Sequence, residues 1–124
     1  DNGDLFIVVN VLSHEFFERE ANHLYCEIPL RIDQAILGDE IEVPTLTKKV
    51  LLKIPPETQT GKVFKLRDLG AGSLHGNSKG DLFIRVVVET PSKISGEQKK
   101  NISDAFSDLE KNFAESKKFI DKLF

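Results

Sequence analysis

The fold is decided by a stretch that occurs twice in the chain, as GDLFIVVNV at residues 3–11 and as GDLFIRVVV at residues 80–88. Both copies place a Gly-Asp turn before alternating β-forming residues, a pattern typical of a strand with one buried face. A repeated sequence unit predicts a repeated structural unit. We therefore expect residues 1–12 to be the last strand of one β-module and residues 13–91 to be a complete second module, within a larger protein.

Between the two copies, short alternating segments are separated by Pro and Gly, which predicts several strands joined by turns. A short helix is expected near residues 33–37, with Gly38 as its stop. Pro29 cannot donate a ladder hydrogen bond, which favours a sheet edge or a strand end for its segment. The predicted fold is mainly β: a small β-sandwich from about Leu24 to Thr90, the second of two tandem β-modules, with one short helix and a C-terminal amphipathic helix.

Beyond Pro91 the apolar period changes to that of a helix, and residues 92–124 form a third segment. Ser95 followed by Gln98 is a capping box, which predicts the start of a helix. A stripe of apolar residues follows at helical spacing, with a break possible near Asn112 or residues 116–118. The stripe either covers the module's own sheet or meets a second copy of the chain, and the pattern leaves both open. Its members are Ile102, Phe106, Leu109 and Phe113.

Composition argues against several functions. The net charge of −3 disfavours a general nucleic-acid or anionic-membrane surface, and the apolar runs are too short to span a bilayer. The three histidines lack the paired spacing of zinc ligands. Cys26 alternates with apolar residues and is interpreted as an inert core thiol, which suits a reducing compartment. The Gly-rich loop at residues 70–76 leads into a strand rather than a helix, so a phosphate site is not predicted.

Several motifs together resemble the C-terminal region of the DnaJ (J-domain co-chaperone) family, bacterial type. His14, Phe17, Arg19 and Leu24 match its H-x-x-F-x-R-x-G-x-x-L connector, although Ala21 stands where Gly is usual. The stretch GDEIEVPTL at residues 38–46 resembles G-x-x-x-x-V-P-T-L. Residues 54–67 resemble its I-P … T-Q-x-G … F-R-L-R stretch, and the Gly-Asp-Leu strand resembles the end of each tandem module. The match runs through residues 3–109.

The resemblance implies a cytoplasmic protein that binds unfolded polypeptides, passes them to a DnaK-type seventy-kilodalton chaperone and dimerises through its C-terminus. Leu5 and Ile7 are the implied client-groove residues, and the apolar helix stripe is the implied dimer interface. The family's J-domain signature and Cys-x-x-Cys zinc repeats are absent from the sequence. We therefore expect no cofactor, no metal, no catalysis, and no nucleic-acid or membrane partner.

Two other functions stay open. One is a β-sandwich ligand-binding or adhesion module, for example for carbohydrate, which would need exposed aromatic rings for sugar stacking. The chain has no Trp and a single Tyr, Tyr25, which weakens that alternative. The other is a hydrolase, for which the sequence offers no nucleophile constellation.

Overall fold

The computed structural model describes residues 16–72 and 79–123. The chain divides into two units, Asp1–Thr90, here called the β-module, and Pro91–Phe124, here called the C-terminal unit. The expected strand in residues 1–12 lies outside the described residues, and each unit is described by itself.

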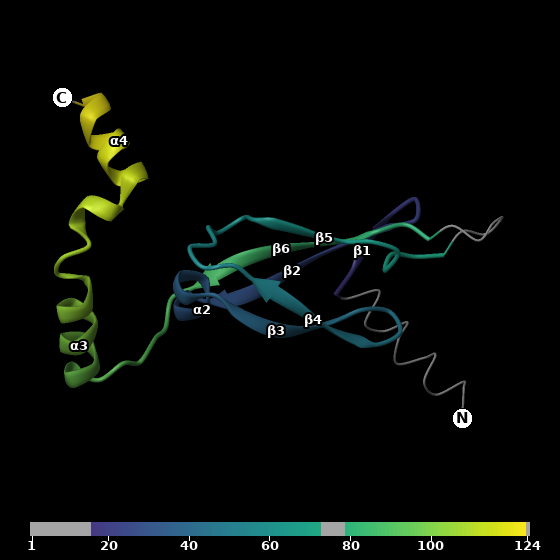
Figure 1. Cartoon of the computed structure of the whole chain (residues 1–124), viewed down its shortest axis with the longest axis horizontal. Coiled ribbons are helices and arrows are strands. Elements are labelled where there is room, and N and C mark those ends of the chain that lie inside the picture. Colours follow the sequence, from purple (N-terminus) through teal and green to yellow (C-terminus); the bar gives the residue numbers. More distant parts are fainter. Residues whose placement is uncertain (1–15, 73–78, 124) are drawn as a thin grey trace. The chain divides into compact units, whose positions relative to one another are not determined.

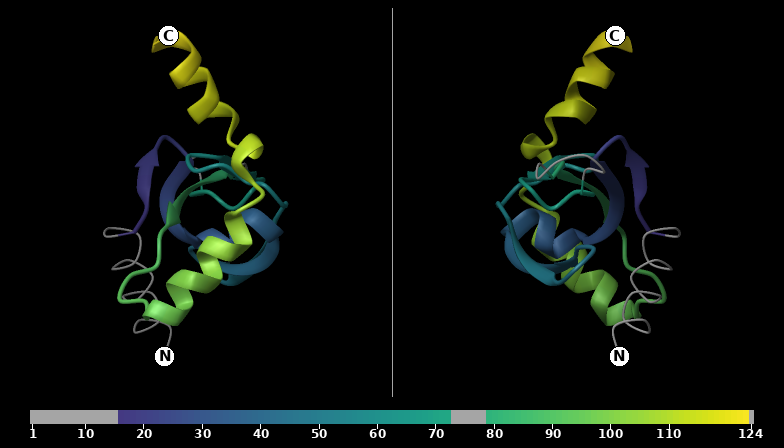
Figure 2. Two further views of the ribbon diagram at one scale, coloured as in Figure 1. Left: turned by 90° about the vertical axis from the view of Figure 1, so that its left-hand side faces the viewer. Right: turned by 90° about the vertical axis from the view of Figure 1, so that its right-hand side faces the viewer.

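Within the described residues the β-module contains two sheets and one short helix (Figure 1). A four-stranded sheet has the order β1-β2-β6-β5, and a two-stranded sheet pairs β3 with β4. The end-on views of Figure 2 show the sheets curving around a shared interior, which confirms the predicted small β-sandwich. The elements are β1 (Glu18–Glu20), β2 (His23–Arg31), α2 (Ile32–Leu37), β3 (Asp39–Pro44), β4 (Lys49–Ile54), β5 (Val63–Leu66) and β6 (Leu82–Glu89).

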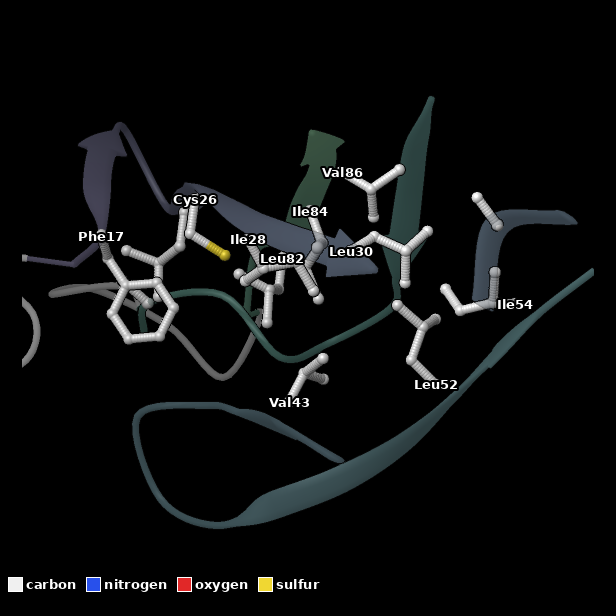
Figure 3. Packing of buried hydrophobic residues seen from close by; sticks show 13 residues of the cluster. Phe17, Cys26, Ile28, Leu30, Val43, Leu52, Ile54, Leu82, Ile84 and Val86 are labelled. Carbon is white, nitrogen blue, oxygen red and sulfur yellow. The ribbon is translucent and has the colours of Figure 1, made fainter. Parts of the chain in front are cut away.

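The core lies between the two sheets and is built by the alternation that the sequence predicts. On β2 every second residue from Leu24 to Leu30 is buried, and on β6 the same holds from Leu82 to Val86. The opposite sheet contributes the apolar positions of β3 and β4. Figure 3 shows these side chains meeting in one cluster: Phe17, Cys26, Ile28, Leu30, Val43, Leu52, Ile54, Leu82, Ile84 and Val86.

The two longest strands, β2 and β6, pair in parallel, with Leu24 opposite Leu82 and Arg31 opposite Glu89. The Leu24 amide donates to the Asp81 carbonyl at 3.0 Å, so the even-numbered amides of β2 point toward β6. Because successive amides of a strand point to opposite sides, the Pro29 nitrogen lies on the other side. β2 is inside the strand order, but β1 covers it only as far as Tyr25, so Pro29 has no strand partner on that side among the described residues and costs no ladder bond.

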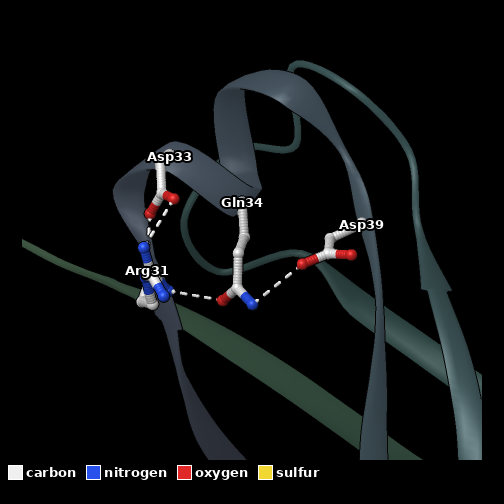
Figure 4. Close-up of polar contacts among 4 residues, drawn as sticks. All are labelled: Arg31, Asp33, Gln34 and Asp39. Carbon is white, nitrogen blue, oxygen red and sulfur yellow. Dashed lines mark hydrogen bonds and ion pairs between the residues drawn. The ribbon is translucent and has the colours of Figure 1, made fainter.

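The predicted short helix is α2, which ends at the predicted Gly38 stop. Gly38 has a φ of 81° and its amide donates to the Gln34 carbonyl at 2.9 Å. A chain of polar contacts holds the helix start (Figure 4): the Gln34 side chain accepts from the Arg31 amide and donates to Asp39, both at 3.1 Å. The Arg31 guanidinium also pairs with Asp33 at 2.8 Å.

The structure adds a strand that the sequence reading treats as a connector. β1 pairs antiparallel with the start of β2, with Glu18 opposite Tyr25 and Glu20 opposite His23. The turn between them places Ala21 at a φ of 54°, in the left-handed region. Glycine reaches this region without strain, which explains why the resembling connector motif has Gly at this position.

The C-terminal unit contains α3 (Gly96–Phe106), a short 3-10 turn (Glu110–Asn112) and α4 (Ala114–Leu123). The predicted capping box is present, since the Gln98 amide donates to the Ser95 hydroxyl at 3.1 Å and the Gln98 side chain accepts from the Ser95 amide. The expected break falls between residues 107 and 113, whereas residues 116–118 lie inside α4. None of the described helices is long and apolar enough to cross a bilayer.

Candidate functional site

An open groove of about 680 Å³ is lined by residues of β1, β2, β5 and β6 and by the two residues before β1. Four strands and the residues just before β1 contribute to it, so its lining comes from distant parts of the sequence. The lining residues are Phe16, Phe17, Glu18, Tyr25, Cys26, Glu27, Val63, Phe83 and Arg85.

Aromatic rings dominate the apolar surface of this groove. Tyr25 and Phe83 are register partners on β2 and β6, and their rings stack with centroids 5.0 Å apart and planes inclined by 11°. Phe16 and Phe17 meet edge to face at 5.0 Å. Tyr25 and Phe83 point away from the core because they alternate with buried neighbours on the same strands. Sheet pairing therefore turns two outward side chains into one aromatic surface.

The groove also exposes a stretch of strand edge. β1 covers β2 only from His23 to Tyr25, and past that point no backbone group of the described residues pairs with β2 on that side. By the alternation set by the Leu24 amide, the Glu27 amide and carbonyl and the Pro29 carbonyl face this opening. The next amide on that side, from Arg31, is already taken by the Gln34 side chain. The edge thus offers one donor and two acceptors to an added strand.

The charged lining residues are Glu18, Glu27 and Arg85. Arg85 lies opposite Glu27 in the sheet register, and their charged groups are 3.8 Å apart. Both side chains are more than half exposed, so water screens the pair and its contribution to stability is small, about 0–1 kcal/mol. These charged groups and the aromatic rings line the same groove.

Cys26 is the residue in the groove whose chemistry could suggest catalysis. Its side chain is buried, and burial raises the pKa of the thiol to about 11. A thiol with such a pKa is protonated at neutral pH and is a poor nucleophile. This agrees with the sequence interpretation of an inert core thiol.

His23 serves the fold through its Nδ1 atom. The Asp81 amide donates to this nitrogen at 3.0 Å, which joins the starts of β2 and β6. The other two histidines, His14 and His75, lie outside the described residues. Within those residues, no group of three His, Cys, Asp or Glu side chains is arranged to hold a metal ion. The expectation of no metal stays a prediction.

The Asp81 carboxylate fixes the loop that leads into β6. It accepts the Asp68 amide at 3.1 Å and pairs with the Lys65 ammonium at 3.5 Å. The hydrogen bond from the Asp68 amide lowers the pKa of Asp81 most, and Lys65 and His23 add to this effect against the opposing cost of desolvation. Because these bonds explain the shift, we assign the carboxylate a structural role.

The site residues predicted from the sequence fall in two places. The client-groove candidates, Leu5 and Ile7, lie outside the described residues. The four stripe residues of the C-terminal unit are described, and Phe106 and Phe113 stack with ring centroids 6.2 Å apart. Since α3 ends at Phe106, the stripe does not run along one helix; Leu109 and Phe113 follow in the break.

The groove itself is absent from the sequence prediction. Its signal is present, however, in the outward positions of the strands, which ordinarily carry polar residues on a solvated face. Tyr25, Val63 and Phe83 occupy such positions. Large apolar residues on the outward, solvent-exposed face of several strands are the pattern that indicates a binding surface.

A family described as the DnaJ C terminal domain matches the chain over residues 1–91. The match covers the whole β-module and confirms the family that the sequence motifs resemble.

Proposed function

The chain belongs to the DnaJ C-terminal domain family and is the C-terminal region of a DnaJ-type co-chaperone, and we propose that it binds unfolded polypeptide clients. We further propose that it forms a homodimer and that the full-length protein delivers clients to a DnaK-type seventy-kilodalton chaperone in the cytoplasm. The family is a chaperone family rather than a catalytic one. The match favours this function over the adhesion and hydrolase alternatives.

The observation that carries client binding is the aromatic groove beside an open stretch of strand edge. An extended segment can add to such an edge through backbone hydrogen bonds that do not read its sequence. The three available groups on Glu27 and Pro29 permit a short ladder, with each bond contributing about 0.5–1.5 kcal/mol net. Tyr25, Val63 and Phe83 then supply an apolar surface for the client's side chains. Weak, unspecific binding of this kind suits diverse unfolded clients.

The test is whether the full chain keeps a chemically unfolded model protein in solution, measured by light scattering after dilution from denaturant. Wild type is expected to suppress scattering. The double variant Tyr25→Ser/Val63→Ser removes partly exposed apolar surface from the groove and should lose most of this effect. Leu51→Ser is the matched control, because Leu51 is 64% exposed on the outer face of β4, away from the groove. Equal protection by wild type and the double variant would contradict the assignment to the groove.

Dimerisation is proposed from the apolar residues of the C-terminal unit. Helices as short as α3 and α4 are marginally stable alone in water and need packing against an apolar partner. Yet Ile102, Phe113, Phe119, Ile120 and Leu123 are all 41–64% exposed in the single chain. A second copy would present the same apolar set across a two-fold axis. Burying each large side chain fully contributes about 1.5–3 kcal/mol, against an association cost of about 4–15 kcal/mol.

Sedimentation at micromolar concentration tests the dimer. Phe106→Asp should give a folded monomer, because a charge buried against its own symmetry mate is strongly unfavourable. Lys100→Asp is the control, since it also adds a carboxylate to α3 but at an exposed position on the helix side away from Ile102 and Phe106. Circular dichroism checks that both variants fold. A monomeric wild type would rule the proposal out.

A further inference from the structure

The two edges of the four-stranded sheet carry charges of opposite sign. Beside the groove, the outward carboxylates are Glu18 and Glu20 on β1 and Glu27 on β2. On β5, which forms the other edge of the described sheet, Lys65 is exposed and pairs with Asp81, and the exposed Lys62 and Arg67 flank the strand. An added strand would therefore meet an acidic border at the groove and a basic border at β5.

Inside the groove the charge count is also acidic. Its lining holds two carboxylates and one guanidinium, which gives a formal charge of −1. The single cation, Arg85, is 3.8 Å from Glu27 and is partly neutralised by it. Glu18 makes no ion pair within the described residues at 4.0 Å or less. Of the three charged lining groups, Glu18 is the one most available to an incoming cation.

The carboxylates are placed beside the aromatic surface. Glu18 lies opposite Tyr25 in the sheet register, and Glu27 is the next outward residue after Tyr25 on β2. A cation that approaches either carboxylate is thus adjacent to the stacked Tyr25 and Phe83 rings. Aromatic faces attract Lys and Arg by themselves, and the attraction increases when a carboxylate is close. An apolar residue of the same client segment can contact the stacked rings from the other side.

We propose that the groove selects client segments in which Lys or Arg stands within two residues of a large apolar side chain, and that it disfavours segments with acidic flanks. This preference rests on the proposed client binding and names its substrate class. Backbone pairing holds any extended segment, whereas the carboxylates at the border discriminate among segments by charge. The basic β5 edge would have the opposite preference, so the sign of the selectivity also identifies the edge that clients use.

The experiment compares three fluorescein-labelled peptides with one Leu-Phe-Ile core, flanked on each side by two Lys, two Glu or two Ser residues. Dissociation constants are measured by fluorescence anisotropy with the full chain. Because an exposed ion pair contributes little, we expect wild type to bind the Lys peptide about three- to tenfold more tightly than the Glu peptide. Raising the salt from about 0.05 M to about 0.5 M should reduce this ratio, since added ions screen exposed charges.

A series of surface variants changes the charge of the groove in both directions. Arg85→Gln makes the lining charge −2 and should increase the Lys/Glu ratio. The double variant Glu18→Gln/Glu27→Gln makes it +1 and should bring the ratio to one or reverse it. Glu42→Gln removes an exposed carboxylate from β3, outside the groove, and should leave the ratio unchanged. Circular dichroism verifies that each variant keeps the wild-type fold.

The outcomes separate this preference from client binding itself. If wild type binds all three peptides equally, the charge preference is wrong and client binding stands. If the Glu peptide binds best, the preference is also wrong and the β5 edge becomes the binding surface. If the ratio survives in Glu18→Gln/Glu27→Gln, the groove carboxylates are not its source. If no peptide binds, including the Ser-flanked one, the proposed client binding fails as well.

Discussion

The β-module and the C-terminal unit have equally clear amphipathic patterns but opposite degrees of burial. In the β-module, the inward residues of β2 from Leu24 to Leu30 and of β6 from Leu82 to Val86 are at most 8% exposed. In the C-terminal unit, no described residue is buried, and several large apolar side chains are about half exposed. An apolar stripe therefore predicts that a face is buried, but it does not identify the partner that buries it. The β-module supplies its own cover, and for the C-terminal unit we propose a second chain.

The difference extends to the backbone. The helices of the C-terminal unit satisfy their hydrogen bonds within a turn or two, as in the Ser95 and Gln98 cap. The β-module depends on pairing between residues far apart in sequence, such as Asp81 with His23. Substitutions in the two units should therefore affect stability very differently, and matched pairs of variants can test this.

The largest expected difference concerns buried and exposed leucines. Leu30→Ala should lower the free energy of unfolding of the β-module by about 2–5 kcal/mol, because Leu30 is fully buried and its removal leaves a cavity. Leu123→Ala should change it by less than about 0.5 kcal/mol, since Leu123 is 60% exposed on α4. Urea unfolding followed by Tyr25 fluorescence reports on the β-module, because the chain has no Trp and no other Tyr. Equal losses of unfolding free energy in both variants would contradict the difference in burial between the two units.

A smaller difference is expected between two glycines. A Cβ at Gly80 would lie 2.1 Å from the Asn22 carbonyl oxygen, which already accepts the Ala71 amide at 2.7 Å. Gly80→Ala should therefore cost at least about 1–3 kcal/mol of β-module stability. Gly96, at the start of α3, has no neighbour within 4 Å, and Gly96→Ala should favour the helix by up to about 1 kcal/mol. Urea unfolding measures the first effect and the helical circular dichroism signal the second. A neutral Gly80→Ala would show that the approach to Asn22 relaxes readily.

The smallest effect concerns two residues in the left-handed region, Ala21 at a φ of 54° and Lys93 at 56°. Ala21→Gly removes strain from the turn between β1 and β2, although it adds entropy to the unfolded chain. The net result should be an increase of up to about 1 kcal/mol in the free energy of unfolding of the β-module, followed by Tyr25 fluorescence. Lys93→Gly relieves the same strain in the C-terminal unit and should leave that free energy unchanged. A loss of stability in Ala21→Gly would mean that the turn tolerates alanine without strain.

Much of the β-module could be predicted from the sequence, and its candidate site could not. The inward alternation, α2 and the Gly38 stop are all read from neighbouring residues. β1 is missed because the burial pattern of its three residues has no alternation and its strand character comes from pairing with β2. The groove is missed because the outward residues of one strand do not reveal which strand lies beside it. Tyr25 and Phe83 become one surface only through the parallel register of β2 and β6.

The family resemblance, the inward faces of the strands, the capped start of α3 and the apolar stripe near the C-terminus could all be read from the sequence. These features follow from residue type and short-range spacing, which are the same before and after folding. The assembled sheet sets the remaining features: β1 stops short of Glu27, the edge of β2 beyond it has no partner within the described residues, and Glu18, Tyr25, Phe83 and Arg85 line the groove beside it. Pairing between strands that are distant in sequence sets these positions, because the outward residues of a strand contact those of its neighbours only after the sheet has formed.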